Sequence, residues 1–577
     1  MWAERARGVP GAAASLEKSV AKVDGYDPRC PLPTRSAVGG EMAPHLRQVT
    51  SSIANARSPV PPEYPDGLLI SQPVPGLEPL DWILIALYGA VVIGVGVWSN
   101  RRQKSTEDYV LGGRALPWWA VGVSLVATSF SSAALIGGTS FGYAKGMSYL
   151  QLQVGDFLAV AAACALFIPF FSRLRITTAY EYLERRFGVV ARSLASALFI
   201  GQTIARAGIL VYGPALALSV ILGWEIEPAI VVTGAAAVLY SAAGGLAAVV
   251  WTDLLQFVVV VVGIGAAIMV VGGDVPGGLA AVVEHASAAG RLVPVTWEFD
   301  MGSVFNLLGA TLAYGTLALS VAGTNQQAVQ RYLACKDASS ARRAAFLGWG
   351  IGFIAVALTL FLGTSLAVWV DVVPIGADVV GSIEADGNAV LPAFIVHRLP
   401  AGLAGLLVAA IFAASMSSMD SAIHSMSTAT LVDFVRRFRR TPAEDAADLR
   451  LARYLTVAYG VIATGAAILA ADEGKLLLDQ LIRWLGYFAG PLLGLFLLGV
   501  CSRRANQLGA VVGVAIGGLV VVAAVVLEVP TAYHFHALWL APLACVVTAA
   551  AGLCVSFFGA APEDVQLDGL TVWDRRP

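Results

Sequence analysis

Thirteen long apolar segments dominate the sequence and constrain its fold more than any other feature. Each is close to the roughly 20 residues that an α-helix needs to cross the hydrocarbon core of a bilayer. Only 13% of the 577 residues are charged, against about 25% in soluble proteins. Because lipid offers no hydrogen bonds to exposed backbone, we predict an all-α integral membrane protein with about 13 transmembrane helices. The predicted spans are 80–99, 117–140, 149–171, 195–221, 226–247, 251–273, 303–324, 344–370, 400–424, 452–471, 477–500, 507–527 and 536–558.

Residues 1–77 differ in composition from the rest of the chain. They are rich in proline, serine and charge and show no sustained apolar pattern. This composition predicts disorder, and the absence of an apolar core after the basic start argues against a signal peptide. The alternative is that this extension precedes the true start of translation, for which Met42 is one candidate.

Basic residues predict the orientation in the membrane. They follow spans one, three, seven, nine and eleven, whereas the alternate loops are poor in basic residues or acidic. The positive-inside rule then places the N-terminus outside and the C-terminus in the cytoplasm of a protein in the plasma (inner) membrane. The basic residues counted are Arg101, Arg102, Lys104, Arg173, Arg175, Arg185, Arg186, Arg331, Lys336, Arg342, Arg343, Arg436, Arg437, Arg439, Arg440, Arg503 and Arg504.

Several classes of protein are disfavoured. The six cysteines are scattered and form no CxxC pair, and the six histidines are equally dispersed, so neither a disulfide framework nor a zinc site is predicted. A net charge of −2 gives no argument for a nucleic-acid partner. We find no nucleophile–base pair or metal cluster at membrane depth, so we do not expect an enzyme.

Polar residues interrupt two of the spans at their middles. Span two contains the run from Ser124 to Ser132, and span nine contains the cluster from Ala413 to Ser421. Hydroxyls and a carboxylate at bilayer depth lack water to satisfy them, and a bound ion is the usual reason for their presence. Ala414, Ser417 and Ser418 share one helical face. The alternative is that these serines pack helices together and bond their own backbone carbonyls.

Four segments resemble signatures of the sodium:solute symporter family, which includes sugar, proline, iodide, vitamin and sialic acid transporters. They are Tyr109–Trp119, Tyr180–Gly188, Gly244–Asp253 and Gly490–Phe496, and the resemblance covers about residues 80–510. It implies a LeuT-like core of two inverted repeats of five helices.

The resemblance and the spans together divide the chain into regions. The first repeat is predicted at 117–275 and the second at 300–505. Residues 78–116 hold the first transmembrane helix and a cytoplasmic loop, and 506–577 hold two C-terminal helices and a short tail. Inverted repeats place broken helices at matching positions around a midplane site. Spans two and seven, the first of each repeat, are both interrupted by polar residues and glycine.

The resemblance implies a sodium ion as the coupling ion. Its ligands would be the carbonyls of Ala127, Phe130 and Ala414 and the hydroxyls of Ser417 and Ser418.

A second cation site is implied in some relatives. Here it would involve Asp253, Asp420 and Ser421. Asp253 could instead cap the N-terminus of span six. Asp420 departs from the family pattern and could take a proton rather than sodium, which leaves proton coupling as an alternative. An isolated aspartate at the bilayer centre costs about 3 kcal/mol, so it needs a partner.

The resemblance also implies a site for the transported solute. Sialic acid transporters of the family hold the substrate carboxylate with an arginine at the position of Arg206, whereas the alternative is that Arg206 pairs with a structural carboxylate or with carbonyls, or reaches an interface. Tyr149 would form an aromatic wall, and Arg483 is either a second anionic contact, part of the outer gate, or the partner of Asp479. The remaining candidates are Ser129, Ser131 and Gln153.

Departures from the sugar transporters narrow the expected solute. Ala318 and Val321 stand where the bacterial sugar transporter has an asparagine and a tyrosine, and Ala134 replaces a polar residue that both sugar and sialic acid transporters use. We therefore expect a sodium-coupled symporter that imports a small polar solute with a carboxylate by alternating access; a sugar or polyol symporter is the alternative. The expected partners are sodium, the solute and membrane lipid, with no nucleic acid, and a monomer should suffice.

Overall fold

The computed structural model describes residues 77–100, 106–241, 245–440, 445–470, 477–563 and 567–574. The predicted disorder of residues 1–77 falls almost wholly outside this part of the chain. The described residues form helices and no named strand. The longer helices are α3 (Pro79–Asn100), α5 (Trp118–Ser129), α6 (Ser132–Lys145), α7 (Leu152–Leu166), α10 (Val189–Leu222), α11 (Ile226–Ser241), α12 (Leu246–Asp274), α13 (Gly278–Ala288), α16 (Ala338–Val372), α19 (Leu403–Ala429), α20 (Asp445–Ala470), α21 (Leu477–Cys501), α22 (Gln507–Val526) and α24 (Leu540–Ser556).

Shorter helices connect or extend these elements. They are α4 (Thr106–Leu111), η3 (Gly146–Gln151), α8 (Ile168–Leu174), α9 (Tyr180–Phe187), η4 (Gly309–Tyr314), α14 (Gly315–Gly323), α15 (Gln326–Leu333), α17 (Ala377–Ala385), α18 (Val390–Arg398), η6 (Thr430–Arg436), α23 (Val529–Ala532) and η7 (Ala537–Trp539).

The all-helical prediction is confirmed, and every predicted span overlaps a helix. Within the described residues, 10 helical segments are long and apolar enough to cross a membrane. Three shorter apolar helices, Trp118–Ser129, Ile226–Val238 and Gly309–Gly323, lie at the predicted spans two, five and seven. The count of 13 stays a prediction, as does the division into two repeats.

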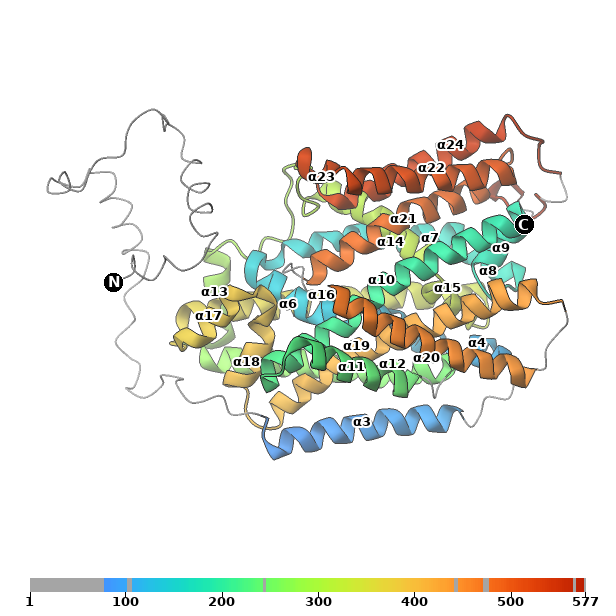
Figure 1. Ribbon diagram of the computed structural model, residues 1–577. Helices are drawn as coiled ribbons and strands as arrows, with labels where there is room; N and C mark the ends of the chain where they lie inside the picture. Colours follow the sequence, from blue (N-terminus) through green and yellow to red (C-terminus); the bar gives the residue numbers. More distant parts are fainter. Residues whose placement is uncertain are drawn as a thin grey trace, which may run out of the picture. The chain divides into compact units, whose positions relative to one another are not determined.

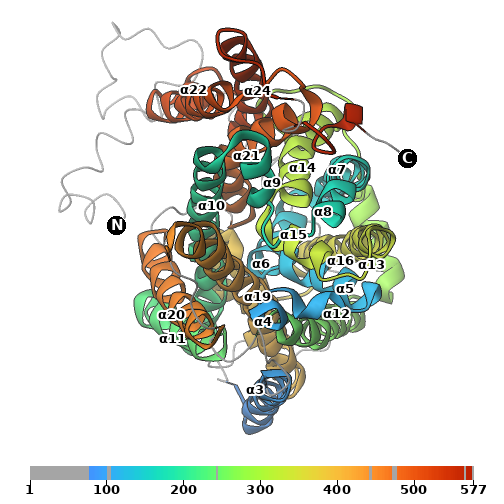
Figure 2. The ribbon, with the colours of Figure 1, turned by 90° about the vertical axis from the view of Figure 1, so that its right-hand side faces the viewer.

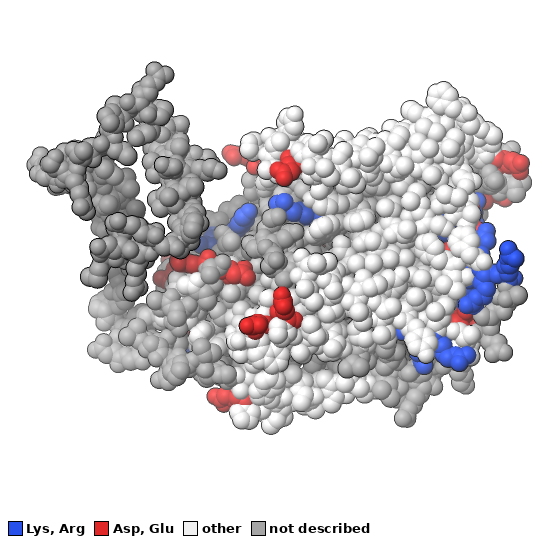
Figure 3. All heavy atoms as spheres, viewed as in Figure 1, with Lys and Arg blue, Asp and Glu red and all other residues white. Residues whose placement is uncertain are grey.

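The long helices run side by side as a bundle (Figure 1). Viewed along the bundle, α19 lies in the interior, where it packs against α5, α10 and α12, while α3 lies at the periphery (Figure 2). The space-filling view shows a broad band without charge between two charged ends, and Lys and Arg gather at the right-hand end, where α9 lies (Figure 3). An uncharged band between polar ends is what a bilayer requires of a protein surface.

The predicted interruption of span two is confirmed, and it falls between α5 and α6. α5 ends at Ser129, Phe130 leaves the helical conformation at φ −88° and ψ 88°, and Ser131 is extended. The hydroxyl of Ser131 accepts a hydrogen bond from the backbone N–H of Ala134, which caps the start of α6. A serine at an N-cap satisfies one of the backbone donors that a helix start leaves free.

Span seven also ends in a break, at its C-terminal end. α14 ends at Gly323, and Asn325 is extended with its side chain accepting from the N–H of Gln327 at the start of α15. The N-terminal part of the same span, η4, is a π-helix that ends at Tyr314. Single turns of π-helix often mark functional sites.

Some of the arginines that were counted as loop charges lie inside the protein instead. Arg331, on α15, is 1% exposed, and Arg186, on α9, is 2% exposed. Arg186 donates to the carbonyls of Gly499 and Ser502. The orientation argument therefore rests on the remaining basic residues.

Candidate functional site

Four of the five predicted ligands of the sodium site, those of Ala127, Ala414, Ser417 and Ser418, come together where α5 ends against α19. The hydroxyl of Ser417 donates to the carbonyls of Ala127 (2.8 Å) and Ala414 (3.1 Å). The hydroxyl of Ser418 donates to the carbonyl of Thr128 at 2.9 Å and lies 3.5 Å from that of Ala127. Two hydroxyls and three carbonyls thus share one small buried region, a set of oxygen donors that suits sodium at a broken helix.

These two serines differ from their neighbours on α19. Ser421 and Ser425 donate to carbonyls of their own helix, those of Ser417 and Ser421 at 2.7 and 2.6 Å. Ser417 and Ser418 instead reach across to α5. The carbonyls they reach belong to the last turn of α5, which has no intrahelical donors of its own and carries the negative end of the helix dipole. Phe130 follows directly, and its backbone N–H donates to Val126.

Asp253 does not cap a helix, so that alternative is wrong. α12 begins at Leu246, and Asp253 lies two turns further on, fully buried. Its Oδ2 accepts from the hydroxyl of Ser124 at 2.5 Å and from Nη2 of Arg331 at 3.1 Å. The same Nη2 donates to the hydroxyl of Ser421 at 2.5 Å.

Two of the three residues predicted for the second cation site, Asp253 and Ser421, therefore lie on either side of the guanidinium of Arg331. Asp253 and Ser421 both contact Arg331, while Asp420 is 3% exposed on the same stretch of α19. Sequence reasoning missed this role of Arg331. Gln327 and Arg331 stand at i and i+4 on one face of α15, and the Gln327 carbonyl accepts from Arg331, but no local pattern in the sequence points to its contact with Asp253.

A cavity of about 240 Å³ lies beside the break between α5 and α6. Four of the predicted solute-binding residues line it: Ser129, Tyr149, Gln153 and Arg206. The positions that depart from the sugar transporters, Ala134, Ala318 and Val321, line it too and leave those parts of the wall apolar.

Two predicted solute residues are not among those that line this cavity. Ser131 is fully buried, and its hydroxyl serves as the cap of α6. Arg483 is half-buried on α21, whose neighbouring Ile482 and Leu485 do line the cavity. The side chain of Asp479, the alternative partner of Arg483, lies outside the described residues.

Arg206 is buried in α10 and donates only to neutral groups. Its Nη1 donates to Oε1 of Gln327 and its Nη2 to the carbonyl of Thr128, both at 2.8 Å. Its Nε has no partner, and no carboxylate among the described residues pairs with it. The Thr128 carbonyl also accepts from Ser418, so one backbone oxygen joins the solute cavity to the ion site.

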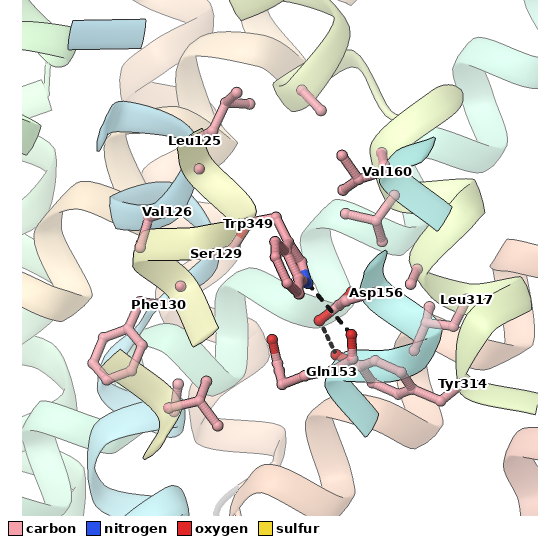
Figure 4. Close-up of a pocket in the computed structure, with 18 of the residues that line it drawn as sticks. Leu125, Val126, Ser129, Phe130, Gln153, Asp156, Val160, Tyr314, Leu317 and Trp349 are labelled. Carbon is pink, nitrogen blue, oxygen red and sulfur yellow. Dashed lines mark hydrogen bonds between the residues drawn. The ribbon is translucent and has the colours of Figure 1, made fainter. Parts of the chain in front are cut away.

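Sequence reasoning also missed Asp156, which lines the cavity from α7. The hydroxyl of Tyr314 donates to its Oδ2 over 3.4 Å. Figure 4 shows Asp156, Gln153, Tyr314 and Trp349 together at one side of the cavity. The signal was present in the sequence, because a carboxylate inside a predicted span is by itself a candidate functional residue.

This arrangement defines the class of protein. A helix is broken inside a helical bundle, its end lies against hydroxyls of a neighbouring helix, and a cavity with a few polar side chains lies beside it, as in secondary transporters. Residues 109–517 match the model of the Sodium:solute symporter family, and the chain belongs to this family.

Individual relatives cover most of the chain. The sodium/sialic acid symporter of Proteus mirabilis (strain HI4320) is 30% identical over 77% of this chain and 89% of its own length. The sodium-coupled monocarboxylate transporter 2 of Danio rerio is 33% identical over 82% of this chain and 76% of its own length. The sodium-dependent multivitamin transporter of Oryctolagus cuniculus is 31% identical over 81% of this chain and 73% of its own length.

The fold matches a solved transporter structure. A Na⁺-coupled sialic acid symporter, in a substrate-bound outward-open state, gives a TM-score of 0.75 at 27% identity and covers 84% of this chain and 99% of that one. The chain thus has the LeuT-like fold, and it is a sodium-coupled symporter rather than an enzyme.

Proposed function

We propose that the solute carried with sodium is small and bears a carboxylate, which Arg206 binds in the cavity beside α5. The observation that supports this is the unbalanced charge of Arg206, which is buried against neutral acceptors only. A charged side chain at the bilayer centre costs about 3 kcal/mol on insertion scales. A guanidinium binds a carboxylate through two parallel hydrogen bonds, so the solute would compensate this cost.

We further propose that sodium binds to Ala127, Phe130, Ala414, Ser417 and Ser418 before the solute. Sodium would draw the hydroxyl lone pairs towards itself and fix the end of α5. The Thr128 carbonyl accepts hydrogen bonds from both Ser418 and Arg206, so fixing the end of α5 would also fix the position of the Arg206 guanidinium. The solute then meets a preorganised Arg206, and the loaded bundle changes from outward to inward access.

The second cation site stays a proposal with a specific condition. The guanidinium of Arg331 lies between Asp253 and Ser421 in this structure. A second sodium at these residues therefore requires that Arg331 withdraw during the transport cycle. Asp420 would take part either as a ligand or by carrying a proton.

The orientation is proposed from the charge distribution. Lys and Arg gather at the end of the bundle where α9 lies (Figure 3). The positive-inside rule makes this end cytoplasmic, with the N-terminal side of α3 outside and the protein in the plasma (inner) membrane.

The test is uptake into proteoliposomes by purified protein with Arg206→Gln and Arg206→Lys variants. Labelled monocarboxylates, sialic acid and polyols are offered with sodium or choline outside. We expect sodium-dependent uptake of a carboxylate that falls at least tenfold in both variants, because lysine lacks the planar fork of arginine. Arg450→Gln, at an exposed position on α20, is the matched control.

Two outcomes would contradict the proposal. If Arg206→Gln takes up the carboxylate as well as the wild type does, Arg206 does not bind the solute carboxylate. Uptake that persists in choline and follows an imposed pH gradient replaces sodium by protons as the coupling ion.

A further inference from the structure

We propose that Asp156 is a second pole of the solute site and that the solute carries a protonated amine in addition to its carboxylate. This inference rests on the proposed function, since it adds a second charge to the carboxylate-bearing solute bound by Arg206.

Asp156 is held at the cavity wall by a close contact between helices. The preceding residue, Gly155, lies so near to η4 that a Cβ atom there would be 2.2 Å from the carbonyl of Ala310. α7 therefore packs directly against η4 and α14, and the next side chain along, Asp156, lies beside Tyr314. One turn earlier on α7, Gln153 lines the same cavity (Figure 4).

No structural partner balances the charge of Asp156. Its Oδ2 accepts from the Tyr314 hydroxyl at 3.4 Å, longer than the 2.5–3.0 Å typical of a good O–H···O bond, and the neutral side chain of Gln153 also hydrogen-bonds to the carboxylate. Within the described part of the chain, no arginine, lysine or histidine forms a salt bridge with it. The carboxylate therefore faces the cavity with hydrogen bonds from neutral side chains only.

Arg206 and Asp156 thus give one cavity two unbalanced charges of opposite sign. They do not pair with each other, and the wall around them is largely apolar, with Val160, Leu317 and Trp349 among its residues. Opposite charges that stay apart inside a membrane are costly unless something bridges them. A solute with a carboxylate at one end and an ammonium group at the other bridges both, with the ammonium donating to Asp156.

The alternative solute is a plain carboxylate. It would satisfy Arg206 and leave Asp156 without an opposite charge, beside the neutral Tyr314 and Gln153 only, which is unfavourable for a buried ionised side chain. Only a protonated Asp156 would suit such a solute. The two readings differ in whether an amine on the solute strengthens binding.

The experiment compares matched solutes on purified full-length protein in sodium. The solute series, called the ladder below, consists of 2-aminobutyrate, 3-aminobutyrate, 4-aminobutyrate and 5-aminopentanoate, in which the amine lies progressively further from the carboxylate. Each is compared with the corresponding carboxylate that lacks the amine, and butylamine serves as the amine that lacks a carboxylate. Affinity is read from ligand-induced thermal shifts and from isothermal titration. We expect at least one amino acid to bind tenfold or more tightly than its deaminated partner, and butylamine to bind weakly.

Variants assign this preference to Asp156. Asp156→Asn keeps the shape but not the charge, and it should abolish the tenfold preference by weakening the binding of the amino acid far more than that of the plain carboxylate. Asp156→Glu keeps the charge on a longer arm, and it should move the best solute to a shorter member of the ladder. A sodium-induced thermal shift in each variant shows that it is folded.

The outcomes separate this inference from the function on which it rests. Equal binding of amino acids and plain carboxylates by the wild type, or equal loss of both in Asp156→Asn, overturns the role of Asp156 and leaves the carboxylate assignment in place. Carboxylate binding that is unchanged in Arg206→Gln overturns the proposed function. Failure of every carboxylate in the ladder to bind overturns both.

Discussion

At the scale of single residues, the hydroxyls of Ser417 and Ser418 connect two helices that the chain itself places far apart. We expect Ser417→Ala and Ser418→Ala each to raise the sodium concentration for half-maximal uptake at least tenfold, because each removes one ligand from a buried ion. The measurement is uptake of a fixed solute concentration against external sodium.

The matched control for this prediction is Ser425→Ala. Ser425 donates only to carbonyls of its own helix, those of Ser421 and Ala422. Its loss should leave the sodium dependence within about twofold of the wild type. A sodium dependence that is unchanged in both Ser417→Ala and Ser418→Ala would refute the ion site.

At the scale of elements, α16 offers two glycines in different surroundings. A Cβ atom at Gly363 would lie 1.9 Å from the carbonyl of Thr139 on α6, whereas one at Gly350 would meet nothing within 4 Å. Gly363→Ala should therefore destabilise the protein by roughly 1–3 kcal/mol through overpacking. Gly350→Ala should be neutral or stabilising by about 0.5–1 kcal/mol. Thermal unfolding in detergent compares the two, and equal midpoints would contradict the close packing of α6 and α16.

A polar contact at one end of the bundle predicts a pH dependence. Glu184 on α9 accepts from Arg192 and from Arg437, both at 2.5 Å. Partial burial opposes its charge, but these two arginines outweigh that effect and hold the pKa of Glu184 below its ordinary value of 4.5. A lowered pKa in the folded state means that the contact stabilises the protein above the unfolded pKa and ceases to do so as the pH falls through the lower folded value.

The corresponding variant is Glu184→Gln. It should unfold at a lower temperature than the wild type at pH 7, and the difference should shrink as the pH falls below about 4.5. Thermal unfolding of both proteins between pH 3.5 and 8 tests this. A difference that does not change with pH would show that the charge of Glu184 contributes nothing.

At the scale of the whole molecule, the orientation predicts which loops face each side of the membrane. Trp297, 79% exposed in the segment before η4, should lie outside, and Glu563, exposed after α24, should lie inside. A membrane-impermeant maleimide applied to intact cells should label Trp297→Cys but not Glu563→Cys, with the unmodified protein as background. The reverse pattern would invert the proposed topology.

The driving force also belongs to the whole molecule. One positive charge that crosses 100 mV gains about 2.3 kcal/mol, and a tenfold sodium gradient adds about 1.4 kcal/mol. A net neutral solute carried with one sodium could then be accumulated several hundredfold.

The sequence by itself determined the helical membrane fold and the break in span two. These features depend on local properties: apolar length sets a span, and the polar run around Ser131 ends one helix and caps the next. The serines of the proposed ion site could be singled out for a similar reason, since Ser417 and Ser418 share one helical face.

Only the tertiary structure decided which distant charges meet. It buried Arg331 against Asp253, although the sequence suggested a loop residue and a helix cap. It also placed Asp156 in the same cavity as Arg206 and left Ser131 out of that cavity's lining. The physical reason is that the energy of a buried charge depends on the groups around it in space, and helix packing supplies those groups from remote parts of the chain.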